Sequence, residues 1–491
     1  MMSYLELLKL ALPEAVAVLT ALVVLSIGLL AKRPAKACGS VAALGILVAI
    51  GVILLLPRNA TLFGGMLVIT PLNSLFKIIC LALAFFTVLL TQAEKATRHA
   101  GEYLALVLLA AVGLMLLVGS EELLMIFIGL ELLGLSLYVM TAFDKADLRS
   151  AEAGLKYFLF GSTSSAFTLF GISLIYGATK TTGLAAIATK LPSISLQPLV
   201  AVAIVMTLVG FAFKIAAAPF HLWAPDAYQG APVPSAAFIA SGSKVASFVV
   251  LGKILLVGFA PVHGSAGWHA MVAGWSPVLA ALAALSIVIG NLVALAQSNV
   301  RRLLAYSAVA HAGYTLIGFV AGDRAGFSAA LFYITVYAVT LVGAFGVVGV
   351  VRRETGGDDF ANFSGLVTRS PLLAGCMAIF ILSLAGIPPL AGFFGKFYLF
   401  SAALHAVANQ GLLWLVALGL AGSFVSLYYY LLVLKLIFVD EPLVAAAQSV
   451  DGLRIPSPIA HHAAVVLLAA AVVLLGVMPN VLASQIVAAT P

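Results

Sequence analysis

The sequence predicts an all-α membrane protein that crosses the bilayer about fourteen times. Hydrophobic residues make up 63% of the 491 residues and charged residues only 9%, and the mean hydropathy is +1.18. Soluble proteins do not have this composition. The apolar runs continue for about 20 residues, the length at which an α-helix crosses the hydrocarbon core. A β-barrel is disfavoured because its strands are about half as long and alternate in polarity.

Polar residues, prolines and glycines separate the runs and limit each predicted span. In chain order the spans lie near residues 11–31, 37–56, 71–91, 102–119, 121–141, 152–177, 196–219, 232–258, 272–297, 300–320, 327–350, 371–408, 411–438 and 459–486. Helices satisfy their own backbone polar groups in lipid. The first run contains Glu14 and lacks a small-residue cleavage signature. We therefore expect a retained helix there and not a removed signal peptide.

The seventh and twelfth spans each contain a helix break beside a lysine. Lys214 is followed by three alanines and Pro219, and the segment SLAGIPPL at 383–390 precedes Lys396. Proline removes a backbone donor and clashes with the preceding turn. The breaks lie five spans apart, as two consecutive inverted five-helix repeats would require, and paired broken helices in such repeats indicate a transport site. A simple packing kink at each proline is the alternative.

This arrangement predicts four parts. They are peripheral helices 1 to 3 at residues 1–101, a first five-helix repeat (spans 4 to 8) at 102–258, a second, inverted repeat (spans 9 to 13) at 270–440, and a C-terminal transmembrane helix at 459–491.

The net charge of +7 does not indicate a nucleic-acid partner, because the positive residues sort by side of the membrane and form no patch. With the N-terminus outside, cytoplasmic loops receive Lys32, Arg33, Lys36, Lys95, Arg98, Lys145, Arg149, Arg301, Arg302, Arg352, Arg353, Arg369 and Arg454. The opposite side receives only Lys9, Arg58, Lys180, Lys190 and Arg324. Since lysine and arginine concentrate on the cytoplasmic side, we expect both termini on the periplasmic side.

Four ionisable residues lie near the centres of apolar runs: Glu131, Lys214, Lys244 and Lys396. Such groups are costly at mid-membrane depth and are usually functional. A buried lysine can load and release a proton near neutral pH. The alternative is a permanently charged ammonium held by carbonyl groups or by an acid.

Two relationships among these residues are expected. Glu131 is the only carboxylate near the middle of a span in the repeat region, and we predict that it pairs with Lys214. The state of that pair, closed or separated, would then control the proton on the lysine, unless the pair is permanent and structural. His311 lies at the centre of span 10 and titrates near neutrality. It either bridges Lys244 and Lys396 or is a hydrogen-bonded core histidine.

Other charged residues have secondary roles in this interpretation. Lys253 and Lys435 lie nearer the ends of their spans, where a lysine can reach the membrane surface. Lys253 is either such an end-of-span lysine or a further member of the relay, and Lys435 with Tyr428 to Tyr430 suits a membrane interface. Lys156 is expected to be a cytoplasmic anchor, and Lys77 would pair with a neighbouring subunit. Asp226 would cap the helix that follows the turn HLWAPDAYQGAP.

Neither a metal nor a redox cofactor is indicated. Cys38, Cys80 and Cys376 are far apart, without a CxxC or haem-attachment spacing. No Walker or dinucleotide-binding loop occurs. We therefore expect no cofactor in this chain.

The chain resembles the antiporter-like membrane subunits of respiratory complex I, the proton-pumping NADH:quinone oxidoreductases. The resemblance covers essentially the whole chain and is carried by GLELLGLSLY at 129–138, AEAGLKYFLFGS at 151–162, FKIAAAPFHLWAPDAYQGAPVP at 213–234, SGSKVASF at 241–248, NVRRLLAYSAVAHAGY at 299–314 and GIPPLAGFFGKFYLF at 386–400. Within the family it is most similar to the N type. GAPVPSAAF departs slightly from the usual threonine-containing form but leaves the charged residues unchanged.

The resemblance implies a bacterial inner-membrane protein with no redox centre, driven by electron transfer from NADH to quinone in other subunits. It implies neighbouring antiporter-like and small membrane subunits as partners, within the lipid bilayer. Glu131 and Lys214 would be the ion pair, Lys244 the central relay group and Lys396 the outward gate. Two other functions remain open: a subunit of a multisubunit cation/proton antiporter, and a membrane scaffold that conducts no protons.

Overall fold

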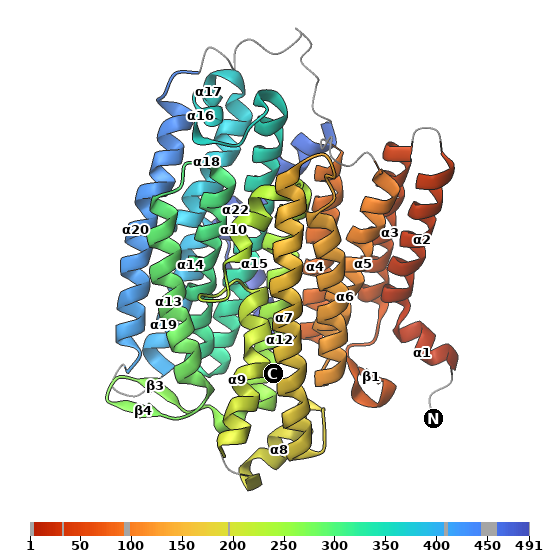
Figure 1. Cartoon of the computed structure of the whole chain (residues 1–491), viewed down its shortest axis with the longest axis vertical. Coiled ribbons are helices and arrows are strands. Elements are labelled where there is room, and N and C mark those ends of the chain that lie inside the picture. The colour runs from red at the N-terminus through yellow and green to blue at the C-terminus, as the bar shows by residue number, and fades with distance from the viewer. Residues whose placement is uncertain are drawn as a thin grey trace.

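The computed structural model describes residues 4–31, 34–92, 99–194, 197–406, 411–442 and 459–490, which form a single bundle of long helices (Figure 1). Within these residues, 12 helices are long and apolar enough to cross a membrane. Two further crossings consist of the broken helix pairs α9–α10 and α18–α19, and 12 plus 2 gives the predicted fourteen. The predicted all-α class with broken seventh and twelfth spans is confirmed.

The N-terminal helices lie at one side of the bundle in Figure 1. They are α1 (Tyr4–Leu10), α2 (Leu12–Leu30), α3 (Pro34–Leu55) and α4 (Pro71–Thr91), with a hairpin of β1 (Ala60–Leu62) and β2 (Leu67–Ile69) joined by the 3₁₀ turn η1 (Phe63–Gly65). Helix α4 begins where its sequence favours a start. Thr70 accepts a hydrogen bond from the backbone N of Asn73 at 3.1 Å, and Pro71 occupies the first turn.

The first predicted repeat follows. Its elements are α5 (Ala100–Gly119), α6 (Leu123–Thr141), α7 (Leu148–Thr179), α8 (Leu184–Ile194), α9 (Pro198–Lys214), α10 (Trp223–Gly230), α11 (Val233–Phe238), the π-helical turn η2 (Ile239–Ser243), α12 (Lys244–Lys253) and the π-helical turn η3 (Ile254–Gly258). The last four form one continuous span, so the residues of α12 lie between two π turns.

The second predicted repeat begins after a 3₁₀ turn and a hairpin. Its elements are η4 (Ala260–Val262), β3 (Ser265–Gly267), β4 (Ala270–Val272), α13 (Trp275–Leu295), α14 (Val300–Ala321), α15 (Arg324–Thr355), α16 (Phe360–Phe363), α17 (Leu366–Arg369), α18 (Pro371–Ala385), α19 (Ala391–Ala406) and α20 (Leu413–Phe438). Helices α22 (Ile459–Val477) and α23 (Asn480–Ala489) follow.

Both broken helices end beside their lysines. Helix α9 ends at Lys214, and Ala216 two residues later has a φ of 58°. Helix α18 ends at Ala385, where Gly386 adopts a φ of 86° that favours glycine. The chain becomes helical again at Trp223 and Ala391. The sequence therefore predicts both interruptions correctly.

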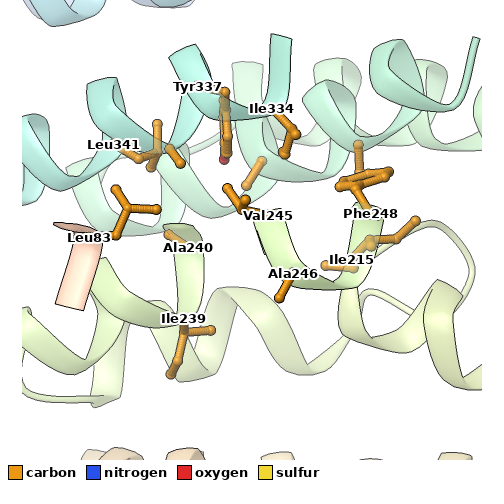
Figure 2. Packing of buried hydrophobic residues seen from close by; sticks show 14 of the residues in the cluster. Leu83, Ile215, Ile239, Ala240, Val245, Ala246, Phe248, Ile334, Tyr337 and Leu341 are labelled. Atoms are coloured by element: carbon orange, nitrogen blue, oxygen red, sulfur yellow. The ribbon is translucent and has the colours of Figure 1, made fainter. Parts of the chain in front are cut away.

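The core lies where the central span packs against α14 and α15. Val245 and Phe248 of α12 face Ile334 and Tyr337 of α15 in Figure 2, and all four are buried. Ile215, just after the break in α9, lies beside the same cluster. The central span is thus enclosed by protein along its length, whereas α2 exposes much of its apolar surface. Ionisable groups on α12 are therefore shielded from lipid.

Several predicted boundaries are wrong. The last span does not run to residue 486, because α22 ends at Val477 and Pro479 precedes a separate helix. The segment between the predicted spans 327–350 and 371–408 is also structured, since it contains the end of α15 and the short helices α16 and α17. Helix α8 and the two hairpins were not predicted. The segment between the last two predicted spans lies mostly outside the described residues. Lys32, Arg33, Lys95, Arg98 and Arg454, on which the predicted orientation partly rests, also lie outside them.

Candidate functional site

Lys214 has a buried ammonium without a hydrogen-bond partner. The residue is 4% exposed, and its Nζ has no donor or acceptor in contact within the described residues. Aromatic rings surround it instead: Nζ lies 5.2 Å from the centre of the Tyr138 ring and 5.8 Å from that of Tyr157. Cation–π contacts of this kind stabilise a desolvated ammonium only in part. A lysine held in this way is suited to exchange its proton.

Glu131 and Lys214, predicted to form a pair that is either closed or separated, do not contact each other directly in the structure. The Glu131 carboxylate accepts a very short hydrogen bond from Ser165 Oγ of α7, and Lys214 has no such bond. The two charges still lie within electrostatic range. Gly134, one turn along α6 from Glu131, provides the space beside the ammonium, because a Cβ there would lie 2.9 Å from Lys214 Nζ. The structure therefore contains the separated form of this pair.

Lys244 begins α12 directly after the π turn η2. The residue is 1% exposed, and its Nζ donates to the carbonyl oxygen of Ala308 on α14 at 3.0 Å. Its Nζ also lies 5.7 Å from the centre of the Tyr337 ring on α15. π turns shift the direction of the following side chains and often occur at functional sites. Lys244 therefore points into the interface between the two predicted repeats.

His311 lies between Lys244 and Lys396, with hydrogen bonds at both ring nitrogens. Its Nδ1 is 2.7 Å from Tyr333 Oη and its Nε2 is 3.1 Å from Tyr430 Oη. The Tyr337 ring, beside which Lys244 lies, is 4.9 Å from the imidazole centre. Which nitrogen carries the proton depends on these tyrosine hydroxyls. Both interpretations of this histidine, bridge and core, are compatible with its contacts.

Lys396 lies on the other side of His311. Its Nζ donates to Ser423 Oγ at 2.7 Å and to the carbonyl oxygen of Ala385, the last residue of α18, at 3.0 Å. Nζ is also 5.2 Å from the centre of the Tyr314 ring, which is itself 5.6 Å from the His311 ring. Tyrosine rings therefore connect Lys244, His311 and Lys396 within the core.

Three tyrosines of this site were missed by the sequence reasoning. Tyr333 and Tyr337 lie in a uniformly apolar helix, where nothing distinguishes them. Tyr430 was predicted to lie at a membrane interface with Tyr428, but only Tyr428 is exposed. Tyr430 is buried and also shares a very short hydrogen bond with Ser307. The sequence run of three tyrosines does not show which of them is buried, because adjacent helical residues point in different directions.

Asp226 and Lys156 form part of a charged cluster. Asp226 is therefore not the predicted cap of the following helix, whereas the predicted cytoplasmic anchor role of Lys156 stays a prediction. Lys156 Nζ lies 2.7 Å from Asp226 and 2.7 Å from Glu152, and Arg302 lies 2.9 Å from Asp226. Asp226 is inside α10, and the next helix begins after Pro232. The cluster fixes α10 between α7 and α14. The cluster thereby fixes the position of α10, the helix that follows the break after Lys214.

Lys77 was predicted to pair with a neighbouring subunit, but its partner lies within this chain. Its Nζ lies 2.6 Å from Glu14 of α2, and both side chains are about nine-tenths buried. The pair connects α2 to α4 inside the peripheral helices. Because an unpaired buried charge is costly, each residue explains the presence of the other.

The described residues contain no group of three or more His, Cys, Asp or Glu side chains that could hold a metal ion. Cys38, Cys80 and Cys376 are buried free thiols. The chemistry that the described site supports is proton exchange among lysine, carboxylate, imidazole and phenol groups.

Comparison with known proteins supplies the family. Residues 120–426 match the model of the transmembrane region of NADH:quinone oxidoreductases and Mrp antiporters. NADH-quinone oxidoreductase subunit N 2 of Acidobacterium capsulatum is 46% identical over 98% of this chain and 98% of its own length. A chain of respiratory complex I from Thermus thermophilus is 33% identical with a TM-score of 0.79, over 96% of this chain and 98% of that one.

A chain of the Mrp complex from a Dietzia species has a TM-score of 0.81 but is only 22% identical, over 99% of this chain and 97% of that one. It therefore shares the fold. The predicted resemblance is confirmed: the chain belongs to the NADH:quinone oxidoreductase/Mrp antiporter family of multi-pass membrane subunits.

Proposed function

We propose that this chain is a proton-translocating subunit in the membrane arm of an NADH:quinone oxidoreductase. The observation that carries the proposal is the series of buried groups Lys214, Lys244, His311 and Lys396, with the partly buried Glu131 on α6. Lys214 and Lys396 each lie beside a broken helix. Groups of this kind inside a membrane protein mark ion and proton pathways. The relative from Acidobacterium capsulatum, named as a subunit N, supports this function.

Glu131 and Lys214 would act as the switch of the relay. An opposite charge within ~4–6 Å favours the charged form of a lysine, so closing the pair would hold the proton and opening it would release the proton. The separated pair and the unpartnered Lys214 ammonium support this role. Lys244, at the end of the first repeat, would then pass the proton to His311 and Lys396 in the second repeat, where Lys396 would be the outward gate.

The two broken spans support the division into repeats at 102–258 and 270–440, flanked by peripheral helices and a C-terminal helix. Corresponding helices also pack in the same way, since α5 packs on α6 as α13 packs on α14. An odd number of spans in each repeat would invert the second copy, as in other transporters built from inverted repeats.

Energy would reach the subunit from outside the chain. Moving one charge against 100 mV costs ~2.3 kcal/mol, and no nucleotide or redox motif occurs in the sequence. Electron transfer from NADH to quinone in other subunits of the complex would supply it. We place the complex in the bacterial inner membrane, with both termini periplasmic on the basis of the Lys and Arg distribution. A protease site added at either terminus should be cleaved from the periplasmic side alone.

Two alternatives remain. A cation/proton antiporter is supported by the shared fold of the Mrp chain, and a non-conducting scaffold would use the same lysines as permanent charges. The antiporter predicts Na⁺-dependent proton exchange without NADH in purified assemblies. The scaffold predicts variants that lose assembly but never lose pumping selectively.

The test replaces Lys214 with methionine and Glu131 with glutamine in the assembled complex in sealed vesicles. Proton uptake and NADH oxidation are measured together. We expect both variants to assemble and to lose quinone-linked proton pumping. Wild-type pumping by both assembled variants would exclude the relay.

A further inference from the structure

A second group of buried charges lies on the other face of the central span. Lys253 is the last residue of α12, nine residues after Lys244. At about 100° per residue this spacing places the two lysines on opposite sides of the helix. Lys244 faces α14, whereas Lys253 faces the end of α5. The relay described above does not use Lys253.

The C-terminal end of α5 lies between two lysine side chains. Lys253 Nζ donates to the carbonyl oxygen of Val118 at 2.7 Å and of Ser120 at 3.3 Å. On another side, a Cβ at Gly119 would lie 3.1 Å from Lys77 Nζ. Carbonyl groups at a helix C-terminus carry partial negative charge and attract both ammonium groups. The Lys77 ammonium also forms an ion pair with the Glu14 carboxylate, with 2.6 Å between Nζ and Oε1. The Lys253 ammonium is instead hydrogen-bonded to backbone carbonyl groups.

A cavity of about 620 Å³ reaches Lys253 from the surface. Its outer lining includes the exposed residues Asn59, Asp323 and Arg324, and its inner lining includes Lys253, which is 5% exposed. Glu121 lines the same space. This volume is many times the ~30 Å³ that one water occupies in the liquid. The cavity is therefore large enough for a chain of waters between the surface and the ammonium.

Two buried polar atoms indicate that the cavity is wet. Asn73, which is 1% exposed, lines it, and its Oδ1 has no hydrogen-bond partner among the described residues. Its Nδ2 is already used, since it donates to the carbonyl oxygen of Val68 at 2.7 Å. His263 lies beside Gly322, another lining residue, and its Nε2 also lacks a partner. Buried polar atoms without protein partners are usually satisfied by water.

We propose that this cavity is an aqueous vestibule through which Lys253 exchanges protons with the side of the membrane that carries both chain ends. The proposal rests on the proposed proton-translocating function. In the release step one N–H bond of the Lys253 ammonium breaks and one O–H bond forms on a vestibule water, which leaves as hydronium. The neutral amine keeps two N–H groups, enough for the carbonyls of Val118 and Ser120. Its charged neighbours are Glu121, the Lys77–Glu14 pair, Asp323 and Arg324.

The vestibule is tested first by thiol labelling of the whole complex in sealed vesicles whose periplasmic face is on the outside. Leu256 lines the cavity, whereas Leu255 next to it is fully buried and does not. We expect a charged, membrane-impermeant methanethiosulfonate to label Leu256→Cys and to leave Leu255→Cys unlabelled. The native cysteines are buried, so the parent chain provides the background. Equal, negligible labelling of both variants would overturn the aqueous vestibule.

The role of Lys253 is tested by Lys253→Arg. Arginine keeps the charge and the carbonyl contacts but does not deprotonate in proteins. We expect an assembled complex whose proton-to-electron ratio falls below that of the parent. Lys190→Arg is the matched control, because Lys190 also donates to a helix-end carbonyl, that of Thr179 at 2.8 Å, but lies outside the cavity.

The vestibule would be overturned if the Lys253→Arg complex has the parental proton-to-electron ratio while the Lys214→Met complex loses proton pumping. The proposed function would then remain intact. Wild-type pumping in Lys214→Met and Glu131→Gln would instead remove the proposed function. The two failures are therefore distinguishable.

Discussion

Gly134 determines where the Lys214 ammonium can lie. A Cβ at this position would approach Nζ to 2.9 Å, closer than real Cβ contacts allow. The flexible lysine can move away at little cost in stability, so Gly134→Ala should reduce proton pumping while the complex still assembles. Gly51→Ala is the control, because a Cβ there meets nothing within 4 Å. The measurement is the proton-to-electron ratio, and equal ratios in both variants would refute the role of this space.

The Glu14–Lys77 pair is expected to matter for stability. Removing one partner of a buried ion pair typically costs about 3–5 kcal/mol, whereas replacing both can be nearly neutral. Lys77→Met should therefore lower the temperature at which the complex dissociates, and Glu14→Gln combined with Lys77→Met should recover most of the loss. The check is thermal dissociation followed by native electrophoresis. A double variant as unstable as the single one would contradict this account.

The central lysines could be predicted from sequence because a single charge is conspicuous in an apolar run. The groups that surround them could not. Ser165 contacts Glu131 and Ser423 contacts Lys396 across different helices, and no local pattern identifies which helices are neighbours. Lys77 was assigned to a partner subunit because its acid lies 63 positions earlier in the chain.

At the scale of elements, the break between α18 and α19 positions Lys396. Gly386 has a φ of 86°, and a Cβ there would lie 3.1 Å from Lys396 Cδ. Gly386→Ala would strain this conformation and displace the lysine from the carbonyl of Ala385. We expect reduced pumping, whereas Gly375→Ala in the same helix, where a Cβ meets nothing within 4 Å, should be neutral. Unchanged pumping in Gly386→Ala would show that the break does not need this geometry.

The sequence predicted these breaks because proline and glycine act locally on the backbone. It did not predict the π turns around α12. The turn η2 packs against α4 and α15, and η3 packs against α8, contacts that no local sequence pattern reveals. It also extended the last span through Pro479, because the residues on both sides are equally apolar. Apolar character alone does not show where a helix ends.

At the scale of the whole molecule, the bundle encloses two lines of charge. One passes from Glu131 to Lys396 through the centre, and the other lies between the peripheral helices and Lys253. The central span belongs to both, with Lys244 on one face and Lys253 on the other. The central span packs against α15, α5 and α4, and its residues are almost fully buried. The bundle in this way keeps the buried lysines of the central span away from lipid.

The measurement that tests the central claim most directly is the proton-to-electron ratio of a complex containing Lys244→Arg. Arginine retains a positive charge and can still donate to the carbonyl of Ala308, but it cannot release a proton. The account predicts an assembled complex that oxidises NADH with a lower ratio than the parent. A complex with Lys244→Arg that pumps at the parental ratio would contradict the relay.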